Sequence, residues 1–345
     1  MAIMARTRRG CSWKRAYGVD PMALEFWRLH RRSRENRVYR FCRRRPPGES
    51  ATAYMLRHGE TRGLTFPMDI MVSELGARRP SKVAVPHACT KSLPESALVD
   101  AGDGLYVSSP EFCFFQMAGV YPLAKLIALG VELCGSYSLP GKTSVGTEQG
   151  TSDQPPQNHD ALEQPIYNLP PLTSLKKLKA FAAHMGGWPG YKRVVKALRY
   201  IADNSASPME TILFILLTLP LRYGGYDLLI PELNGRIYPV KGAKKFSGRE
   251  YYRGDLLWRD AGVVAEYNSD IEHTGPERIA ADAIRQSDLG LCGINVVPVT
   301  IKQIKNLELL DKVARQFAAG IGKRLRCNNP EFAEVQRNLY NTLYR

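Results

Sequence analysis

The sequence predicts a mixed α/β protein, and three observations lead to this prediction. Short β-branched runs typical of strands alternate with longer segments whose apolar residues follow helical spacing. A Pro-, Gly- and Ser-rich stretch divides these segments, which indicates a smaller N-terminal α/β domain and a C-terminal mixed sheet flanked by helices. The chain has 345 residues, 44% of them hydrophobic, and is long enough to give both domains a core.

Residues 1–50 form an arginine-rich arm. Residues 1–46 contain thirteen Arg and one Lys against three acids, a net charge of +11, with Trp, Tyr and Phe interleaved. This composition suits an arm that neutralises and stacks on nucleic acid. A solvated tail that only raises solubility is the alternative, and both interpretations stay open.

Residues 51–138 are expected to form the N-terminal α/β domain. Strand-like pieces at 82–85 and 105–107 precede Ser109-Pro110-Glu111, which reads as a helix start in which Ser109 and Glu111 act as capping residues. The Val-Ser-Ser-Pro-Glu stretch and its apolar helix resemble the C-terminal part of abortive-infection type IV antitoxins, a family of DNA-binding transcriptional repressors. That resemblance implies a DNA or protein partner for this domain.

Two further segments join the predicted domains. Residues 139–171 are dense in Pro, Gly, Ser, Thr and Gln and are expected to be a flexible linker. Residues 172–204 predict two helices broken at residues 186–190, and residues 172–199 carry seven cations and no acid. Lys192, Lys196 and Arg199 fall on one stripe of the second helix, which is either a solvated face or a phosphate-binding one.

The domain at 205–345 contains the most informative stretch, a predicted β-hairpin. Two apolar runs at 256–258 and 263–265 flank Arg259-Asp260-Ala261-Gly262, where Gly262 can adopt a positive φ. A four-residue loop would pair Trp258 with Val263, and a two-residue loop would pair Arg259 with Gly262. The residue numbers of both pairs sum to 521, so either loop predicts that Asp255 lies opposite Glu266. Two facing carboxylates repel unless a positive group lies between them, and a divalent cation is the natural candidate.

A helix and a strand are expected after the hairpin. His273 precedes Thr274-Gly275-Pro276-Glu277, a helix start with Thr as N-cap and Glu at the capping-box position. Asp282 and Arg285 then lie three residues apart on one side of the helix. Residues 294–301 form a β-branched run that predicts the next strand.

This order of hairpin, helix and strand, with acids on the hairpin, resembles the core of the PD-(D/E)XK nuclease superfamily, in particular its very-short-patch-repair-like branch. The residues that carry the resemblance are Asp255, Glu266, His273, Asp282 and Arg285, and it covers roughly residues 205–305. It implies a restriction-endonuclease-like fold in which an early helix adds another acid, here Glu210. Residues 207–210 also read as an ordinary helix cap with Glu210 at the capping-box position.

One departure from the superfamily pattern concerns the residue that activates water. The name implies Glu-x-Lys, whereas this chain has Glu266-Tyr267-Asn268. Asn268 can orient a water or a phosphate but cannot exchange a proton near neutral pH. Members of the repair-like branch often use a His or another acid instead, which would assign the role to His273.

Composition agrees with a nucleic-acid partner. The formal net charge is +15, concentrated in two basic segments, which is typical of a protein that binds polyanions. Lys241, Lys244 and Lys245, just before the hairpin, could contact the phosphate backbone, although a solvated loop is the simpler interpretation. The seven cysteines include no Cys-x-x-Cys pair, and no apolar run is long enough for a bilayer, so we expect a reduced, cytoplasmic protein without a membrane partner.

The sequence therefore predicts a Mg²⁺- or Mn²⁺-dependent nuclease, with DNA as the more favoured substrate and a phage-defence or mobile-element setting. Asp255, Glu266 and Glu210 are the expected metal ligands, and His273 and Asn268 the expected residues around the water. Lys192, Lys196, Arg199, Lys241, Lys244, Lys245, Asp282 and Arg285 are the expected nucleic-acid contacts. Two other classes stay open: a non-catalytic, antitoxin-like DNA-binding regulator on a nuclease-like scaffold, and a structural partner in a defence or mobile-element complex.

Overall fold

A computed structural model describes residues 2–3, 22–33, 40–41, 67–73, 80–82, 84–89, 91–102, 105–141, 164–239, 250–268, 276–327 and 330–344. The chain is mixed α/β and divides into two compact units. Unit 1 comprises Met1–Leu133 with Tyr137–Arg199, and unit 2 comprises Cys134–Ser136 with Tyr200–Arg345.

Unit 1 contains a six-stranded sheet in the order β2-β5-β6-β1-β3-β4. The predicted strands near 82–85 and 105–107 are present as β4 and β6, with slightly different ends. The strands are β1 (Ala2–Ile3), β2 (Arg40–Phe41), β3 (Met68–Val72), β4 (Ala84–Ala88), β5 (Leu98–Gly102) and β6 (Leu105–Ser108).

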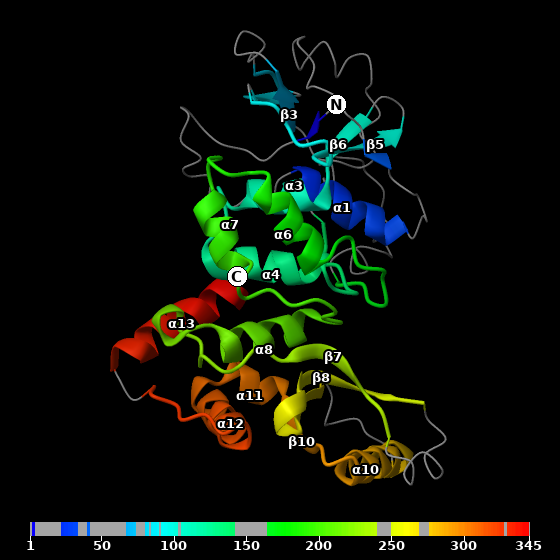
Figure 1. Ribbon diagram of the computed structural model, residues 1–345, viewed down its shortest axis with the longest axis vertical. Coiled ribbons are helices and arrows are strands. Elements are labelled where there is room, and N and C mark those ends of the chain that lie inside the picture. The colour runs from blue at the N-terminus through cyan, green and yellow to red at the C-terminus, as the bar shows by residue number, and fades with distance from the viewer. Residues whose placement is uncertain are drawn as a thin grey trace, which may run out of the picture. The chain divides into compact units, whose positions relative to one another are not determined.

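The helices of unit 1 gather on one side of this sheet (Figure 1). Ser109 caps α3, as predicted: its side chain accepts a hydrogen bond from the amide of Phe112, while buried Glu111 accepts one from the Thr173 hydroxyl at 2.5 Å. The predicted break at residues 186–190 separates two helices. The helices are α1 (Met22–Ser33), α3 (Pro110–Met117), α4 (Leu123–Leu133), α6 (Leu175–Ala183) and α7 (Tyr191–Ala197).

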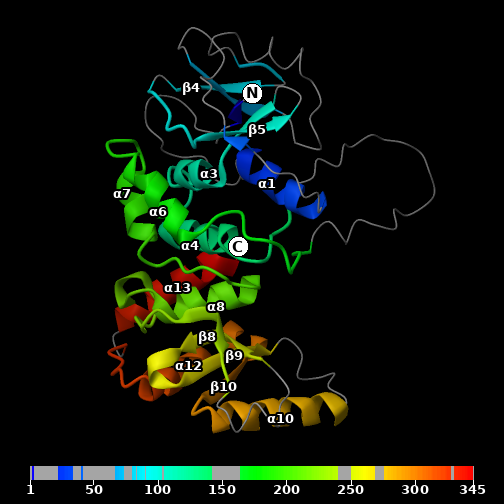
Figure 2. The same cartoon turned by 45° about the vertical axis from the view of Figure 1, so that its right-hand side comes forward.

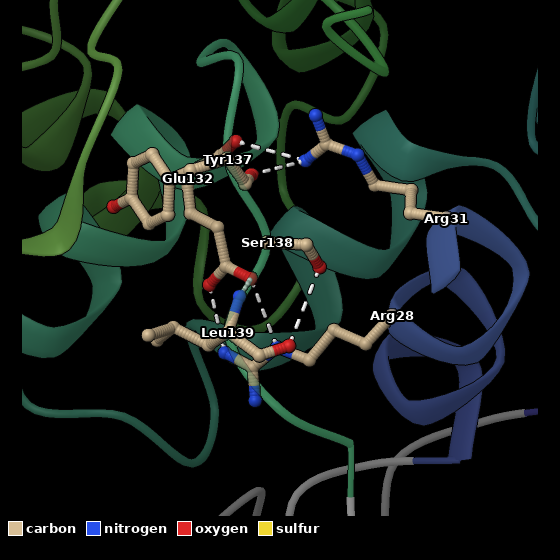
Figure 3. A network of polar contacts seen from close by, with 6 residues as sticks. All are labelled: Arg28, Arg31, Glu132, Tyr137, Ser138 and Leu139. Atoms are coloured by element: carbon tan, nitrogen blue, oxygen red, sulfur yellow. Dashed lines mark hydrogen bonds and ion pairs between the residues drawn. The ribbon is translucent and has the colours of Figure 1, made fainter. Parts of the chain in front are cut away.

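Helix α1 is integrated into unit 1 rather than being the exposed arm that composition suggested for residues 1–50. Phe26 and Trp27 are buried, and the Trp27 indole donates to the Ser108 carbonyl. Arg28 forms a bidentate ion pair with Glu132 of α4, at 3.0 and 2.7 Å. Arg31 donates to the carbonyls of Tyr137 and Glu132 (Figure 3). A buried charge is costly unless it is paired and hydrogen-bonded, so these two arginines hold α1 in place instead of facing solvent.

Unit 2 follows the order helix, three strands, helix, strand. Helix α8 (Pro208–Thr218) precedes β7 (Glu232–Ile237), β8 (Tyr252–Trp258) and β9 (Val263–Asn268). The strands form one sheet in the order β10-β9-β8-β7, antiparallel except for the parallel pair β9 and β10. The later elements are α10 (Pro276–Leu291), β10 (Asn295–Thr300), α11 (Ile301–Lys305), α12 (Leu307–Gly320) and α13 (Pro330–Tyr344).

Packing around this sheet fixes the hairpin. In both views α8 and α13 lie together at one end of the unit and α10 lies at the other (Figures 1 and 2). Leu289 of α10 is fully buried in a cluster that includes Tyr252 and Val264. The hairpin turn ends at Gly262 with φ of +61°, as its sequence position predicted, and the strand at 294–301 is confirmed as β10.

Among the described helices, none is both long and apolar enough to cross a bilayer.

Candidate functional site

Glu210 is the first acid of the candidate site. The side chain of Ser207 caps α8 by accepting from the Glu210 amide at 3.1 Å, as the sequence predicted. The Glu210 carboxylate turns back over the helix start, where its Oε2 accepts from the Ala206 amide at 2.9 Å and from Asn234 Nδ2 at 2.8 Å. Burial raises the pKa of Glu210, although these hydrogen bonds oppose the shift.

Asp255 is the second acid and lies on β8, one residue beyond the paired part of the hairpin. The pairs Leu256↔Ala265 and Leu257↔Val264 both sum to 521, as predicted, and this pairing ends at Leu256 and Ala265, just before Asp255 and Glu266. Asp255 Oδ2 accepts from the Tyr267 amide at 2.7 Å. Burial, followed by the charges of Glu210 and Glu266, raises the pKa of Asp255 to about 7. The carboxylates of Glu210 and Glu266 are therefore both close enough to raise the pKa of Asp255.

Glu266, the third acid, already has a cationic partner. Its Oε1 forms an ion pair with the Arg285 guanidinium of α10, and Arg285 also donates to the Arg253 carbonyl at 2.6 Å. The sequence predicted a positive group between the two acids. In this structure the guanidinium of Arg285 is the positive group next to Glu266. Asp282, which precedes Arg285 by three residues on the same helix, has a side chain outside the described residues.

Asn234 belongs to the site although sequence reasoning missed it. By the register of β7 and β8, Asn234 lies opposite Asp255, and its amide bridges Glu210 to the Asn204 carbonyl at 3.0 Å. Its φ of +50° is a left-handed conformation that is uncommon outside glycine but tolerated by Asn. The available signal was an Asn-Gly pair inside a strand pattern, which marks a local irregularity.

Carboxylate oxygens are the donors that Mg²⁺ and Mn²⁺ prefer, and a cation would relieve the repulsion between Glu210 and Asp255. This donor set fits a divalent ion at those two residues. The fit is incomplete at Glu266, which would first have to leave Arg285. Within the part of the chain that the structure describes, no group of three or more His, Cys, Asp or Glu side chains is arranged to hold a metal.

The other predicted residues fall into two groups. Asn268 is exposed at the end of β9, where it pairs with Thr300 of β10. In unit 1, an exposed basic stripe lies in and just after α7 and consists of Lys192, Lys196 and Arg199. Buried Val194 lies on the opposite side of that helix, as the predicted stripe requires. His273, Lys241, Lys244 and Lys245 lie outside the described residues.

Comparison with known proteins gives a short match. The chain is 32% identical over 80 residues to two proteins of Mycobacterium tuberculosis, "Uncharacterized protein Rv2248" of strain H37Rv and "Uncharacterized protein MT2308" of strain CDC 1551. The match covers 23% of this chain and 27% of each relative, so it spans about a quarter of the length of these curated proteins. No family model and no solved structure matches the chain.

Proposed function

We propose that this protein is a metal-dependent nuclease that hydrolyses phosphodiester bonds, with DNA as the expected substrate. The observation that carries the proposal is the proximity of two buried acids from separate elements, Glu210 of α8 and Asp255 of β8, each with a raised pKa, which is about 7 for Asp255. Perturbed carboxylates that converge from different elements are more typical of a functional site than of a structural one. The resemblance to PD-(D/E)XK nucleases, which includes an acid from an early helix, supports the same activity.

Asp255 and Glu210 would hold the Mg²⁺ or Mn²⁺ ion, with Glu266 joining when Arg285 releases it. The chemistry that the ion supplies when bound is neutralisation of charge on the scissile phosphate and a lower pKa for the attacking water. Asn234 keeps the Glu210 carboxylate oriented by donating to Oε2. Arg285, once free of Glu266, is a guanidinium with the geometry to bind a phosphate.

Proton transfer is assigned to His273. Its unperturbed pKa, about 6.5, makes it the nearby group along the chain that exchanges protons near neutrality, whereas Asn268 can only orient the water. We expect His273→Ala to slow cleavage about 10²-fold without a comparable loss of metal affinity. If His273 is instead a ligand, metal affinity falls and added Mn²⁺ restores part of the rate. Parental rates at every metal concentration would exclude both roles.

A cleavage assay tests the proposal directly. Purified protein should cut DNA with Mg²⁺ or Mn²⁺ and be silent in EDTA, and Asp255→Asn and Glu210→Gln should each lose cleavage while retaining binding. The matched control is Asp260→Asn, an exposed acid in the hairpin turn, which should cleave like the parent. Binding of DNA and RNA without metal-dependent cleavage of either would reject the nuclease.

A non-catalytic, antitoxin-like regulator is the second candidate, and two observations favour it. Asn268 stands where a Lys is usual, and Glu266 is held by Arg285 rather than directed with the other acids at a common ion. Such a protein would bind DNA equally well in EDTA and in Mg²⁺. The same assay therefore separates the two candidates.

A further inference from the structure

The hairpin of β7 and β8 carries an exposed cluster of two arginines and two tyrosines, here called the Arg–Tyr platform: Arg236, Tyr238, Tyr251 and Arg253. Arg236 and Arg253 face each other directly in the register of the two strands. Their guanidinium carbons lie 4.7 and 5.8 Å from the centre of the Tyr251 ring. The Tyr238 and Tyr251 rings are 6.2 Å apart, and Tyr238 is 58% exposed.

The platform is positively charged. No carboxylate of the described residues forms an ion pair with Arg236 or Arg253, whereas the neighbouring Arg259 is paired with Glu232 at 2.5 Å. Like charges that face each other on paired strands repel, so a bound anion would be favourable here, although the Glu250 carboxylate already lies within electrostatic reach of Arg236. Both guanidiniums lie over the half-buried Tyr251 ring, and the exposed Tyr238 ring lies beside it. Cations next to an exposed aromatic ring match a ligand that has both phosphates and flat bases.

The platform adjoins the acids of the candidate site. Asn234 and Asp255 lie two residues from Arg236 and Arg253 on the same strands, a separation of about 6.6 Å along each strand. Arg236 and Arg253 are exposed, and Asn234 and Asp255 on the same strands are half-buried. Arg285, which pairs with Glu266, also donates to the carbonyl of Arg253. A strand bound on the platform would therefore present its backbone to the acids.

We propose that the Arg–Tyr platform binds an unpaired stretch of nucleic acid, with a base stacked on Tyr238 and phosphates held by Arg236 and Arg253. This inference rests on the proposed nuclease function and specifies its substrate as single-stranded. In a duplex the faces of the bases are covered by their neighbours, so an exposed tyrosine can stack only on a base that has left the helix.

Fluorescence anisotropy in EDTA tests binding without cleavage, using labelled single-stranded DNA, single-stranded RNA and blunt duplex DNA of about 16 nucleotides. We expect Tyr238→Ala to weaken single-strand binding about 5- to 150-fold, the range for one lost stacking contact. Tyr238→Phe keeps the ring and loses only the hydroxyl that is hydrogen-bonded to Arg236, so it should bind much more tightly than Tyr238→Ala. The matched control is Tyr167→Ala, an equally polar and 47% exposed tyrosine of unit 1.

The outcomes separate the platform from the nuclease. A loss on single-stranded DNA, on single-stranded RNA or on both, with duplex binding unchanged, supports the platform. Parental affinity of Tyr238→Ala, or an equal loss on blunt duplex, overturns it. Cleavage with Mg²⁺ is then measured on the same variants. If binding depends on Tyr238 but the parent never cleaves, the nuclease proposal alone is rejected. If the parent cleaves and Tyr238→Ala binds and cleaves equally well, the platform proposal alone is rejected.

Discussion

Asp255 is the residue whose chemistry is most altered by the fold. Its pKa of about 7 exceeds the ordinary value for Asp, about 3.9, because burial and the charges of Glu210 and Glu266 disfavour the carboxylate. Between these two values the folded state binds more protons than the unfolded state. The free energy of unfolding therefore falls as pH rises from about 4 to about 7, and levels off above that.

Asp255→Asn should remove this pH dependence. We expect the variant and the parent to differ little near pH 4 and the variant to be more stable at pH 8, by on the order of 1–3 kcal/mol. Urea unfolding in EDTA at several pH values measures the difference. Asp260→Asn, an exposed acid of the same hairpin, should track the parent, and a constant gap between Asp255→Asn and the parent at all pH values would contradict the shift. Added Mn²⁺ should stabilise the parent and not Asp255→Asn.

The β8–β9 hairpin is the element that carries both Asp255 and Glu266, and its turn depends on Gly262. This residue has φ of +61°, and a Cβ added there would lie 2.6 Å from the Gly293 carbonyl oxygen. We expect Gly262→Ala to destabilise the protein by about 1–3 kcal/mol, because the new methyl group meets backbone and the conformation is strained.

A helical glycine nearby provides the matched control for the turn. Gly290, near the end of α10, has nothing within 4 Å of an added Cβ. Gly290→Ala should be neutral or stabilising, by up to about 1 kcal/mol, because alanine favours helix. Thermal unfolding of both variants makes the comparison, and equal Tm values for them would show that the turn does not need a glycine.

Over the whole molecule, the formal net charge of +15 is the property that bears most on nucleic-acid binding. Arg28 and Arg31 are buried and paired, so they contribute no phosphate contact, and deleting residues 1–46 would remove a core helix along with the charge. The exposed stripe of Lys192, Lys196 and Arg199 is the better place to test binding.

Replacing all three with Gln should weaken binding and make the slope of log K against log salt shallower. The expected change is about 0.7 per lost phosphate contact on a single strand and about 0.9 on a duplex. Anisotropy titrations at several salt concentrations measure the slope. A triple variant at exposed Lys302, Lys305 and Lys312 removes the same charge elsewhere and should keep the parental slope. Equal slopes for the two triple variants would show that net charge alone matters.

Local features of this protein were determined by the sequence. The caps at Ser109 and Ser207, the turn at Gly262, the register that pairs Leu256 with Ala265, and strand β10 were all predicted and are all present. Each depends on residues close in the chain, where capping and turn chemistry are specific and one hairpin loop fixes the register of both strands.

Tertiary structure decided how distant segments meet. Asn234 bridges Glu210 to Asn204, Arg285 reaches Glu266 from the next helix, and α1 enters the core because Glu132 pairs with Arg28. Composition alone made the arginines of α1 look like a solvent-exposed arm. The sequence specifies which residues can form such pairs, but only packing of the whole chain selects the partner and supplies the burial that raises the pKa of Asp255.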